Sequence, residues 1–475
     1  MLFRTLLMLS LLVLGVVGLR VPRSLDSKVK DTFPDLLDAG ADDLMKGLKQ
    51  KHFTSVDLVK AYLRRIQEVQ PQLHAVTEIN PDAISIAQAL DAERANGKLR
   101  SALHGLPMLV KDNIAINDKM NNSAGSFALL GAKVPQDSTV VSKLKAAGVI
   151  ILGKSSMSEW ANFRSGAGNA CNGWSAHGGQ VLGAYTADQD PSGSSSGSAV
   201  GASLGLAFAA LGTETSARII FPGSVNNAVG IKPTDSLKGK RIGIPRNAFL
   251  PTGDFNIDAP IMAAFEVAIM ELKAAGATII DNANFSQWGE YYNSSITFYG
   301  AVNTVVAINF ITNLPQYFAQ LTTNPDNITS LRALRDFTQH DPRENYPTRN
   351  TDVFDAALTV TGTYGGVTGA LDTYRLDALV MPSMYAPGVP ALAGLPIVTV
   401  PMGKYPLGTQ VQRLGPCGLV AVAPNVPIGL SFLGAAWSEE ALIGCAFAYE
   451  QRTLVREKVR PIVAPTSQLK DVVDY

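Results

Sequence analysis

The chain contains 475 residues, of which 46% are hydrophobic and 17% are charged. This balance supplies enough apolar side chains for a large buried core and argues against long disordered segments. Forty Lys and Arg residues balance forty Asp and Glu residues, so the chain lacks the positive field that nucleic acids or anionic membranes attract. These values exclude a DNA-binding protein, a coiled coil and a collagen. The length allows about three domains, although α/β enzymes of this size are also built around one sheet.

The N-terminal region has the pattern of a secretory signal peptide. Arg4 supplies a positive charge, and residues 6–17 form an apolar run that is too short to span a membrane comfortably. The small residues Val16 and Gly18 suit cleavage near Gly18. We therefore predict a signal peptide over residues 1–18, leading to secretion or to an endomembrane lumen. An uncleaved signal anchor is the alternative.

A secretory route gives two further residue types a meaning. Asn-x-Ser/Thr triplets are candidate glycosylation sites, and they occur at Asn121, Asn284, Asn293 and Asn327. The cysteines allow at most one disulfide and leave at least one thiol free: Cys171, Cys417 and Cys445. Their spacing does not match a zinc site, and we expect no metal and no cofactor.

The first predicted elements are helices with clear boundaries. Thr54 and Asp57 form a capping box at the start of one helix, and Pro71 is expected to end it. A second helix lies between Pro81 and Gly97. Both helices carry apolar residues at helical spacing, so each is expected to pack one face against a core.

Helices then alternate with apolar strands. Residues 199–211 are almost wholly apolar and small, and we predict a helix there that is buried on all sides. The other expected elements are helices at 138–147 and 441–450 and strands at 107–110, 149–152, 377–381, 397–400 and 428–433. This alternation indicates a mixed or parallel sheet covered by helices on both faces. We expect one α/β domain over residues 30–455, followed by a C-terminal tail over 456–475.

The first stretch with chemical potential is residues 104–113, where Lys111 closes an apolar strand. A lysine at the end of a buried strand is partly desolvated, which lowers its pKa and suits it to act as a general base. For an isolated lysine, a side chain that reaches out from the strand end to solvent is the more ordinary interpretation.

The second stretch is the Gly/Ser-rich segment 191–198, directly before the apolar run. Small hydroxyl residues in such a turn place oxygens and backbone N–H groups where a substrate can approach closely. A flexible linker is disfavoured because the apolar run pins the segment. Residues 193–197 also fit the Gly-x-Ser-x-Gly elbow of α/β-hydrolases, but the only later histidine is His340, far from the C-terminus. A phosphate-binding loop would need a lysine that is absent.

Several stretches together resemble the amidase signature family, in the branch that contains peptide amidases and many plant and fungal amidases. The matching segments are 153–163, 173–175, 190–198, 211–215, 229–234, 377–382, 395–402 and 427–434. The resemblance spans about residues 30–455. It implies an α/β/α fold with a mixed, twisted central sheet, and hydrolysis of C–N amide bonds in a small-molecule substrate by a Ser–Ser–Lys triad.

The triad maps onto this sequence with one exception. Lys111 matches the base, and Ser194 matches the bridging serine, which the family holds in a cis peptide. The position of the nucleophilic serine is occupied by Arg218, and Ala217 stands where the family has glycine. The family builds its oxyanion hole from backbone N–H groups of this turn, here Thr215, Ser216 and Ala217. Ser195 is the hydroxyl that we consider as a substitute nucleophile.

The substitution at the nucleophile position is chemically severe. A guanidinium is not deprotonated in a protein and does not attack a carbonyl. A permanent cation near Lys111 also disfavours the ammonium form of that lysine. We expect Lys111 and Ser194 within hydrogen-bond distance, Arg218 at the same pocket, and Asp112 or Glu214 as the internal partner of Arg218.

A second departure follows Thr234. The family normally carries a further strand and helix there, whereas here Asp235 and Ser236 alone join Thr234 to the stretch beginning at Leu237. Genuine loss and a gene-model error both account for this junction. Loss of a core segment leaves an apolar surface or a cavity unless the remainder repacks.

The leading functional hypothesis is an amidase-family protein of the secretory pathway that acts on a small amide, ester or amine. Ordinary Ser–Ser–Lys hydrolysis is expected to be compromised, with repurposing to a non-hydrolytic biosynthetic step. One alternative is an active amidase with a defective sequence or with Ser195 as nucleophile. Another is a non-catalytic protein that binds a carboxylate through Arg218. We expect no nucleic-acid partner and no stable membrane span.

Overall fold

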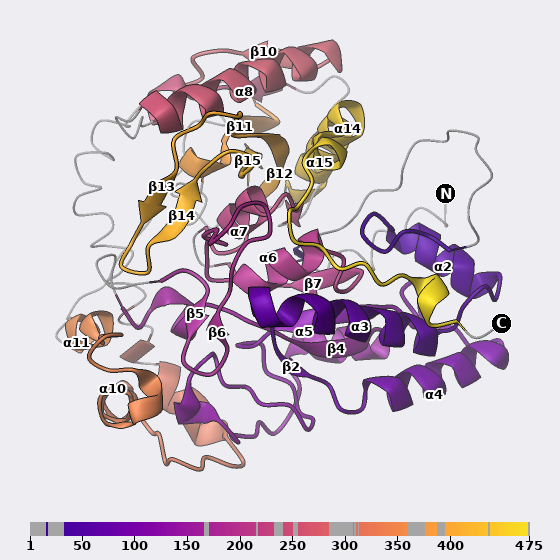
Figure 1. Ribbon diagram of the computed structural model, residues 1–475, viewed down its shortest axis with the longest axis vertical. Helices are drawn as coiled ribbons and strands as arrows, with labels where there is room; N and C mark the ends of the chain where they lie inside the picture. Colours follow the sequence, from indigo (N-terminus) through magenta and orange to yellow (C-terminus); the bar gives the residue numbers. More distant parts are fainter. Residues whose placement is uncertain are drawn as a thin grey trace.

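Within the residues that the structure describes, a mixed sheet of 11 strands forms the centre of the molecule (Figure 1). The computed structural model describes residues 16–17, 33–165, 171–214, 217–231, 241–249, 255–284, 307, 310–311, 313–358, 376–386, 395–435 and 438–473. The order across the sheet is β10-β9-β11-β15-β12-β8-β1-β7-β3-β4-β2.

The strands of the central sheet are β1 Val16–Val17, β2 Val76–Ile79, β3 Pro107–Lys111, β4 Ile150–Ser155, β7 Ala209–Leu211, β8 Gly230–Ile231, β9 Arg241–Gly243, β10 Thr278–Ile280, β11 Ala378–Pro382, β12 Ile397–Lys404 and β15 Pro427–Leu433. Two short hairpins lie outside it, formed by β5 Trp174–Ser175 with β6 Gly179–Gln180 and by β13 Gln412–Leu414 with β14 Leu419–Val422. The α-helices are α2 Ala41–Lys49, α3 Ser55–Leu73, α4 Ala83–Ala95, α5 Thr139–Ala146, α6 Ser196–Ser203, α7 Ile220–Val225, α8 Phe255–Ala274, α10 Leu331–His340, α11 Asp352–Ala357, α14 Glu439–Thr453 and α15 Val455–Lys458.

The direction of the strands brings the end of β3 next to the end of β7. β3 runs parallel to both β4 and β7, with Val110 opposite Leu211. Because parallel strands end at the same edge of a sheet, Lys111 and the residues after Leu211 meet there. This edge carries the candidate site, as is usual for open α/β sheets.

Helices cover both faces of the sheet, as the sequence predicts. Successive side chains of a strand point to opposite faces, and β12 shows this alternation clearly. Val398 and Val400 belong to a core cluster with α8 and α14, whereas Ile397 belongs to a second cluster that includes Ile220 of α7. In Figure 1, α8 and α14 lie over the half of the sheet that contains β11, β12 and β15.

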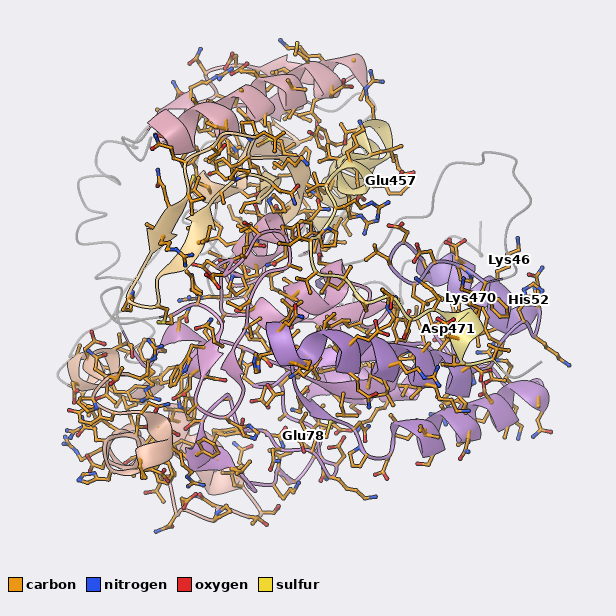
Figure 2. The ribbon with its side chains drawn as sticks, viewed as in Figure 1. Lys46, His52, Glu78, Glu457, Lys470 and Asp471 are labelled. Carbon is orange, nitrogen blue, oxygen red and sulfur yellow. A yellow bond between two sulfur atoms is a disulfide. The ribbon has the colours of Figure 1, made fainter. Side chains whose placement is uncertain are left out.

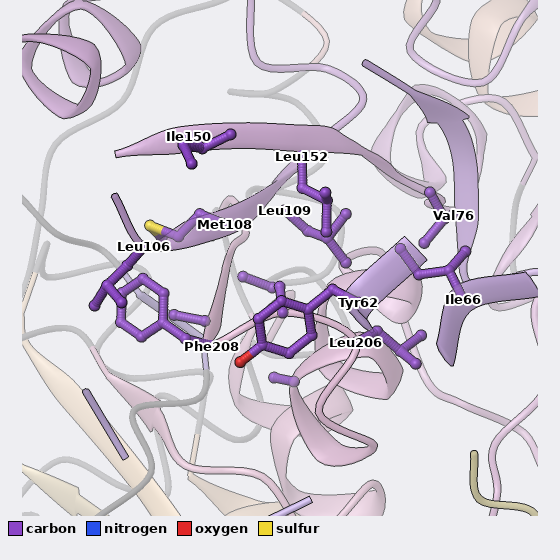
Figure 3. Packing of buried hydrophobic residues seen from close by; sticks show 14 of the residues in the cluster. Tyr62, Ile66, Val76, Leu106, Met108, Leu109, Ile150, Leu152, Leu206 and Phe208 are labelled. Carbon is purple, nitrogen blue, oxygen red and sulfur yellow. The ribbon is translucent and has the colours of Figure 1, made fainter. Parts of the chain in front are cut away.

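The other half of the sheet rests on a core that fixes β3. Tyr62 and Ile66 of α3 belong to the same buried cluster as Met108 and Leu109 of β3 (Figure 3). The helix begins at the predicted capping box, in which Thr54 accepts from the backbone N–H of Asp57. It continues past the predicted stop at Pro71 and ends at Leu73, because a proline within a helix does not always terminate it.

The predicted helix over residues 199–211 is wrong in its second half. Helix α6 ends at Ser203, Gly205 adopts a left-handed φ of 59°, and residues 209–211 form β7 inside the central sheet. A fully apolar run gives no periodicity by which a buried strand is told from a buried helix. The glycine marks where the chain turns from one to the other.

The C-terminal segment after residue 455 packs along α2 and α3. Leu469 belongs to the core cluster of α3, and Arg65 of α3 donates to the backbone oxygen of Ser467 at 2.6 Å. Figure 2 shows Asp471 at this end of the molecule. Arg64 holds its backbone oxygen at 2.6 Å. The segment therefore contributes to the fold over the residues described.

The N-terminal apolar run contributes β1 to the central sheet. Val16 and Val17 pair antiparallel with β7, and Val17 also pairs with β8. The remainder of residues 1–32 lies outside the described residues, so the predicted signal peptide is not described beyond this strand. Cleavage after Gly18 would remove β1 from between β7 and β8. No helix within the described residues is long and apolar enough to cross a membrane.

The cysteines form one disulfide and leave one free thiol, within the limits that their number sets. Cys171 and Cys417 form a disulfide with a Cα–Cα distance of 5.9 Å, and Cys445 is a buried free thiol. The disulfide joins the segment before β5 to the turn between β13 and β14. It therefore connects two parts of the chain that are 246 residues apart.

Candidate active site

Lys111 lies at the centre of a buried hydroxyl cluster. Its side chain is fully buried at the end of β3. Its Nζ lies 2.9 Å from the Oγ of Ser194, 3.0 Å from the Oγ of Ser195 and 2.8 Å from the Oγ1 of Thr213. The expected hydrogen bond between Lys111 and Ser194 is therefore present, while the catalytic role of either residue remains a proposal.

The surroundings of Lys111 favour its neutral form. Burial lowers the pKa of this lysine well below its ordinary value, and the charge of Arg218 lowers it further, while Glu214 opposes the shift. When Lys111 is neutral, its amine has two hydrogens and one lone pair, so it donates to two of its three hydroxyl neighbours and accepts from the third. This is the hydrogen-bond pattern that a general base needs.

The loop that carries Ser194 and Ser195 is fixed on both sides. The peptide between Gly193 and Ser194 is cis, as the family resemblance implies. Ser158 donates its backbone N–H to the Ser194 carbonyl at 3.1 Å. A side chain at position 193 would place its Cβ 2.4 Å from the Ser158 Oγ, so any other residue there would displace the Ser158 hydroxyl. Ser195 directly precedes α6, which begins at Ser196, and is the N-cap residue of that helix.

The turn at the expected nucleophile position lies directly beside this loop. The backbone N–H of Ser195 donates to the carbonyl of Arg218 at 3.1 Å. Ala217 has a φ of 61°, in the left-handed region that costs about 1–2 kcal/mol for a residue with a Cβ. The structure thus places an alanine where the backbone favours glycine. Thr215 and Ser216, the other predicted members of the oxyanion hole, lie outside the described residues.

Two carboxylates were considered as partners for Arg218, and Glu214 is the one whose pKa responds to the charge of Arg218. Burial raises the pKa of Glu214, and hydrogen bonds from the backbone N–H groups of Ile219 and Ile220 and the charge of Arg218 lower it. The carboxylate of Asp112 instead accepts from Ser123 at 2.6 Å. The side chain of Asp112 therefore stabilises the loop after β3.

Thr213 and Lys154 are site residues that the sequence analysis did not select. Thr213 follows β7, so it reaches Lys111 only because β7 pairs with β3. Lys154 lies in β4, fully buried, and its Nζ donates to the Ile114 carbonyl at 2.8 Å and to the Asn122 Oδ1 at 3.0 Å. It thereby holds the loop that follows Lys111. Both residues could have been selected from their position at the ends of the two strands that pair with β3.

Lys154 gives a prediction for the pH dependence of stability. Burial lowers its pKa from 10.5 to about 8, so the unfolded chain binds this proton more tightly than the folded one. The cost of the buried charge is therefore complete below pH about 8 and falls by about 1.4 kcal/mol per pH unit as the pH rises toward 10.5. The free energy of unfolding of the unmodified protein, minus that of Lys154→Met, should rise by this slope above pH 8. A difference that stays constant with pH would contradict the prediction.

The candidate glycosylation sites differ in accessibility. Asn327 is exposed, whereas Asn121 and Asn284 are half-buried and accept hydrogen bonds from Gly131 at 2.8 Å and from Asn247 at 3.1 Å. Asn293 lies outside the described residues. Occupancy by glycans stays a prediction at each of the four positions. Among the residues described, no group of three His, Cys, Asp or Glu side chains is placed to hold a metal ion.

Comparison with known proteins places this chain in a family. A family model described as Amidase matches residues 57–241. An amidase-family protein of Arthroderma benhamiae is 40% identical, with 95% of this chain and 92% of that protein aligned. A second relative, from Arabidopsis thaliana and also named for amidase activity, is 30% identical over 90% of this chain and 93% of that protein.

Solved structures agree with the sequence comparison. The native peptide amidase from Stenotrophomonas maltophilia matches with a TM-score of 0.72 and 30% identity, covering 91% of this chain and 99% of that one. An amidase family protein from Bacillus anthracis matches with a TM-score of 0.73 and 27% identity, covering 90% and 93%. The fold, the relatives and the family model agree, and the chain belongs to the amidase signature family.

Proposed function

We propose that this chain is an amidase-family protein of the secretory pathway in which hydrolysis through an enzyme-bound serine is lost. Its chemistry is a non-hydrolytic step on a small amide, ester or amine. The observation that carries this proposal is the intact hydrogen-bond cluster around Lys111, next to a turn in which Arg218 holds the nucleophile position. A protein that only binds a ligand has no need of a desolvated lysine with a hydroxyl relay.

The reaction that fits these groups is intramolecular aminolysis. An amine of the substrate attacks the ester or amide carbonyl of the same molecule, so no serine of the enzyme is required. Neutral Lys111 accepts the proton of the attacking amine, and the hydroxyl of Ser194 passes a proton to the leaving alcohol or amine. A C–N bond forms, the bond to the leaving group breaks, and the products are a lactam and the leaving group.

Arg218 contributes charge to this reaction. Its guanidinium is close enough to lower the pKa of Lys111 and of Glu214, so it acts on the same small volume. A fixed cation near the attacked carbonyl stabilises the oxyanion that develops in the transition state. The same cation keeps Lys111 unprotonated and ready to accept a proton.

Two observations support the finer parts of the proposal. The disulfide between Cys171 and Cys417 suits an oxidising compartment, which supports a secretory location. The alignment with the Arthroderma benhamiae relative extends over 555 positions, more than the 475 residues of this chain, so it contains gaps in this chain. Such gaps support a shortened domain, with the junction between Thr234 and Leu237 as the place that we propose.

The proposal predicts lactam formation that depends on Lys111. Esters with a well-placed amine, namely ornithine methyl ester and dipeptide methyl esters, are incubated with the protein, and the products are separated by mass. At least one should form its lactam or diketopiperazine faster than without protein, and Lys111→Ala should slow this by about 100-fold or more. Lys60→Ala, which removes an exposed lysine of α3, is the control and should change nothing. Lysine-dependent release of the free acid, or no cyclisation above background from any ester, would overturn the proposal.

A further inference from the structure

A pocket beside the Ser194 loop contains two arginines over one indole ring. The pocket is lined in part by Arg164, Trp174 and Arg349. The guanidinium carbons of Arg164 and Arg349 lie 5.3 Å and 4.9 Å from the centroid of the Trp174 ring. Both distances allow cation–π attraction, so the ring holds the two cations in a fixed arrangement.

The charge of Arg164 is neutralised inside the protein. Its Nη1 lies 2.7 Å from Glu159 and 2.7 Å from Glu344, and all three side chains are buried. Burial and the neighbouring charge of Glu344 raise the pKa of Glu159 well above its ordinary value. Arg164 is therefore paired with two carboxylates inside the protein.

The positive charge of Arg349 is not neutralised by a carboxylate among the residues described. Its Nη1 donates to the Sγ of Cys171 at 2.6 Å, and it forms no ion pair with a described carboxylate. A disulfide sulfur is a weak acceptor that carries no charge. Burial lowers the pKa of Arg349, and the charge of Arg164 lowers it further. A half-buried cation beside a second cation is stabilised by any anion that enters the pocket.

The pocket adjoins the peptide that positions Ser194. Asn162 lines the pocket, and a Cβ on Gly193 would lie 3.2 Å from its Nδ2. Ser158, which donates to the Ser194 carbonyl, accepts through its Oγ from the backbone N–H of Gly173 at 2.8 Å. Gly173 directly precedes Trp174. Ser158 therefore links the Ser194 loop to the residue that precedes Trp174.

We propose that Arg349 and Trp174 form a subsite for a carboxylate on the substrate. The planar guanidinium suits the two oxygens of a carboxylate, and the Trp174 ring holds the guanidinium of Arg349 in place at 4.9 Å. This inference rests on the proposed function in one respect, since it takes the Lys111–Ser194 end as the place where the substrate reacts. The substrate class is then an amide, ester or amine that carries a carboxylate at its other end.

The experiment is a calorimetric titration of the full disulfide-bonded chain with hippurate and with hippuramide, which differ only in carboxylate against carboxamide. Hippurate should bind about tenfold more tightly or better. Arg349→Met should weaken hippurate about 10- to 100-fold and hippuramide less than about twofold. Arg349→Lys, which keeps the charge and loses the fork, should give an intermediate loss. Arg343→Met is the control, because Arg343 also stacks on a ring, that of Phe127, but does not line the pocket.

Equal affinity for the two compounds, no binding of hippurate up to about 10 mM, or full hippurate affinity in Arg349→Met would each overturn the subsite. Circular dichroism of the variants shows that a loss comes from a folded protein, and Arg349→Lys supplies a second folded variant. The titration needs no turnover, so it separates the two proposals. A carboxylate preference that persists in Lys111→Ala, in a protein that cyclises no ester, would retain the subsite and refute the proposed reaction.

Discussion

The double variant Ala217→Gly/Arg218→Ser is expected to gain hydrolysis of simple amides and esters, by roughly 100-fold or more over the unmodified protein. The serine places a hydroxyl on the turn whose carbonyl at position 218 accepts from the backbone N–H of Ser195, a residue that itself contacts Lys111. The glycine suits the left-handed φ of 61° that alanine now occupies. Hydrolysis is measured as release of the free acid from unbranched esters and anilides that carry no internal amine.

The controls separate the hydroxyl from the loss of the cation. Ala217→Gly/Arg218→Ala removes the guanidinium and supplies no hydroxyl, so it should remain as inactive in hydrolysis as the unmodified protein. Arg218→Ser alone should gain less than the double variant, because the backbone stays strained at Ala217. Equal hydrolysis in the unmodified protein and the double variant would show that Arg218 does not block the reaction.

Removing the carboxylate of Glu344 is expected to destabilise the protein by about 3–5 kcal/mol. Glu344 is fully buried and accepts from Arg164 at 2.7 Å, from the Ser126 hydroxyl at 2.8 Å and from the Phe127 backbone N–H at 2.8 Å. In Glu344→Ala these donors lose their acceptor, and the buried charge of Arg164 keeps one carboxylate partner, Glu159, in place of two.

The measurement is the free energy of unfolding in urea, with Glu266→Ala as the matched control. Glu266 also pairs with an arginine, Arg246, but its side chain is 52% exposed. An exposed pair contributes about 0–1 kcal/mol, so the control should lose little. Similar losses in the two variants would contradict the assignment of Glu344 as a buried partner of Arg164.

The parts of the site that the sequence predicted are those carried by rare local motifs. Lys111 at the end of an apolar strand and Ser194 in a glycine-rich turn each stand out by the residues directly around them. Thr213 and Lys154 do not, because their importance depends on which strands lie next to β3. Both residues lie in segments that resemble the family, 153–163 and 211–215, but the sequence alone did not show that their side chains reach Lys111 or the loop after it.

The fold can likewise be divided into features that the sequence predicted and features that it did not. The mixed sheet with helices on both faces followed from the alternation of apolar runs, and the strands at 377–381, 397–400 and 428–433 lie within one or two residues of their observed bounds or inside them. The prediction of a single helix over residues 199–211 failed because burial on all sides removes the periodicity that distinguishes helix from strand. The pocket at Arg349 was also beyond prediction, since it unites residues far apart in the chain.

The most direct test of the proposed loss of the nucleophile is rapid mixing of the unmodified protein with p-nitrophenyl acetate, followed by mass analysis of the peptides. An acyl-enzyme would appear as a burst of p-nitrophenol and an acetyl group on a serine of the site. We predict no burst beyond that of Lys111→Ala and no acetyl group on Ser194 or Ser195. A lysine-dependent burst with the acetyl group on Ser195 would contradict the account and assign the nucleophile to that serine.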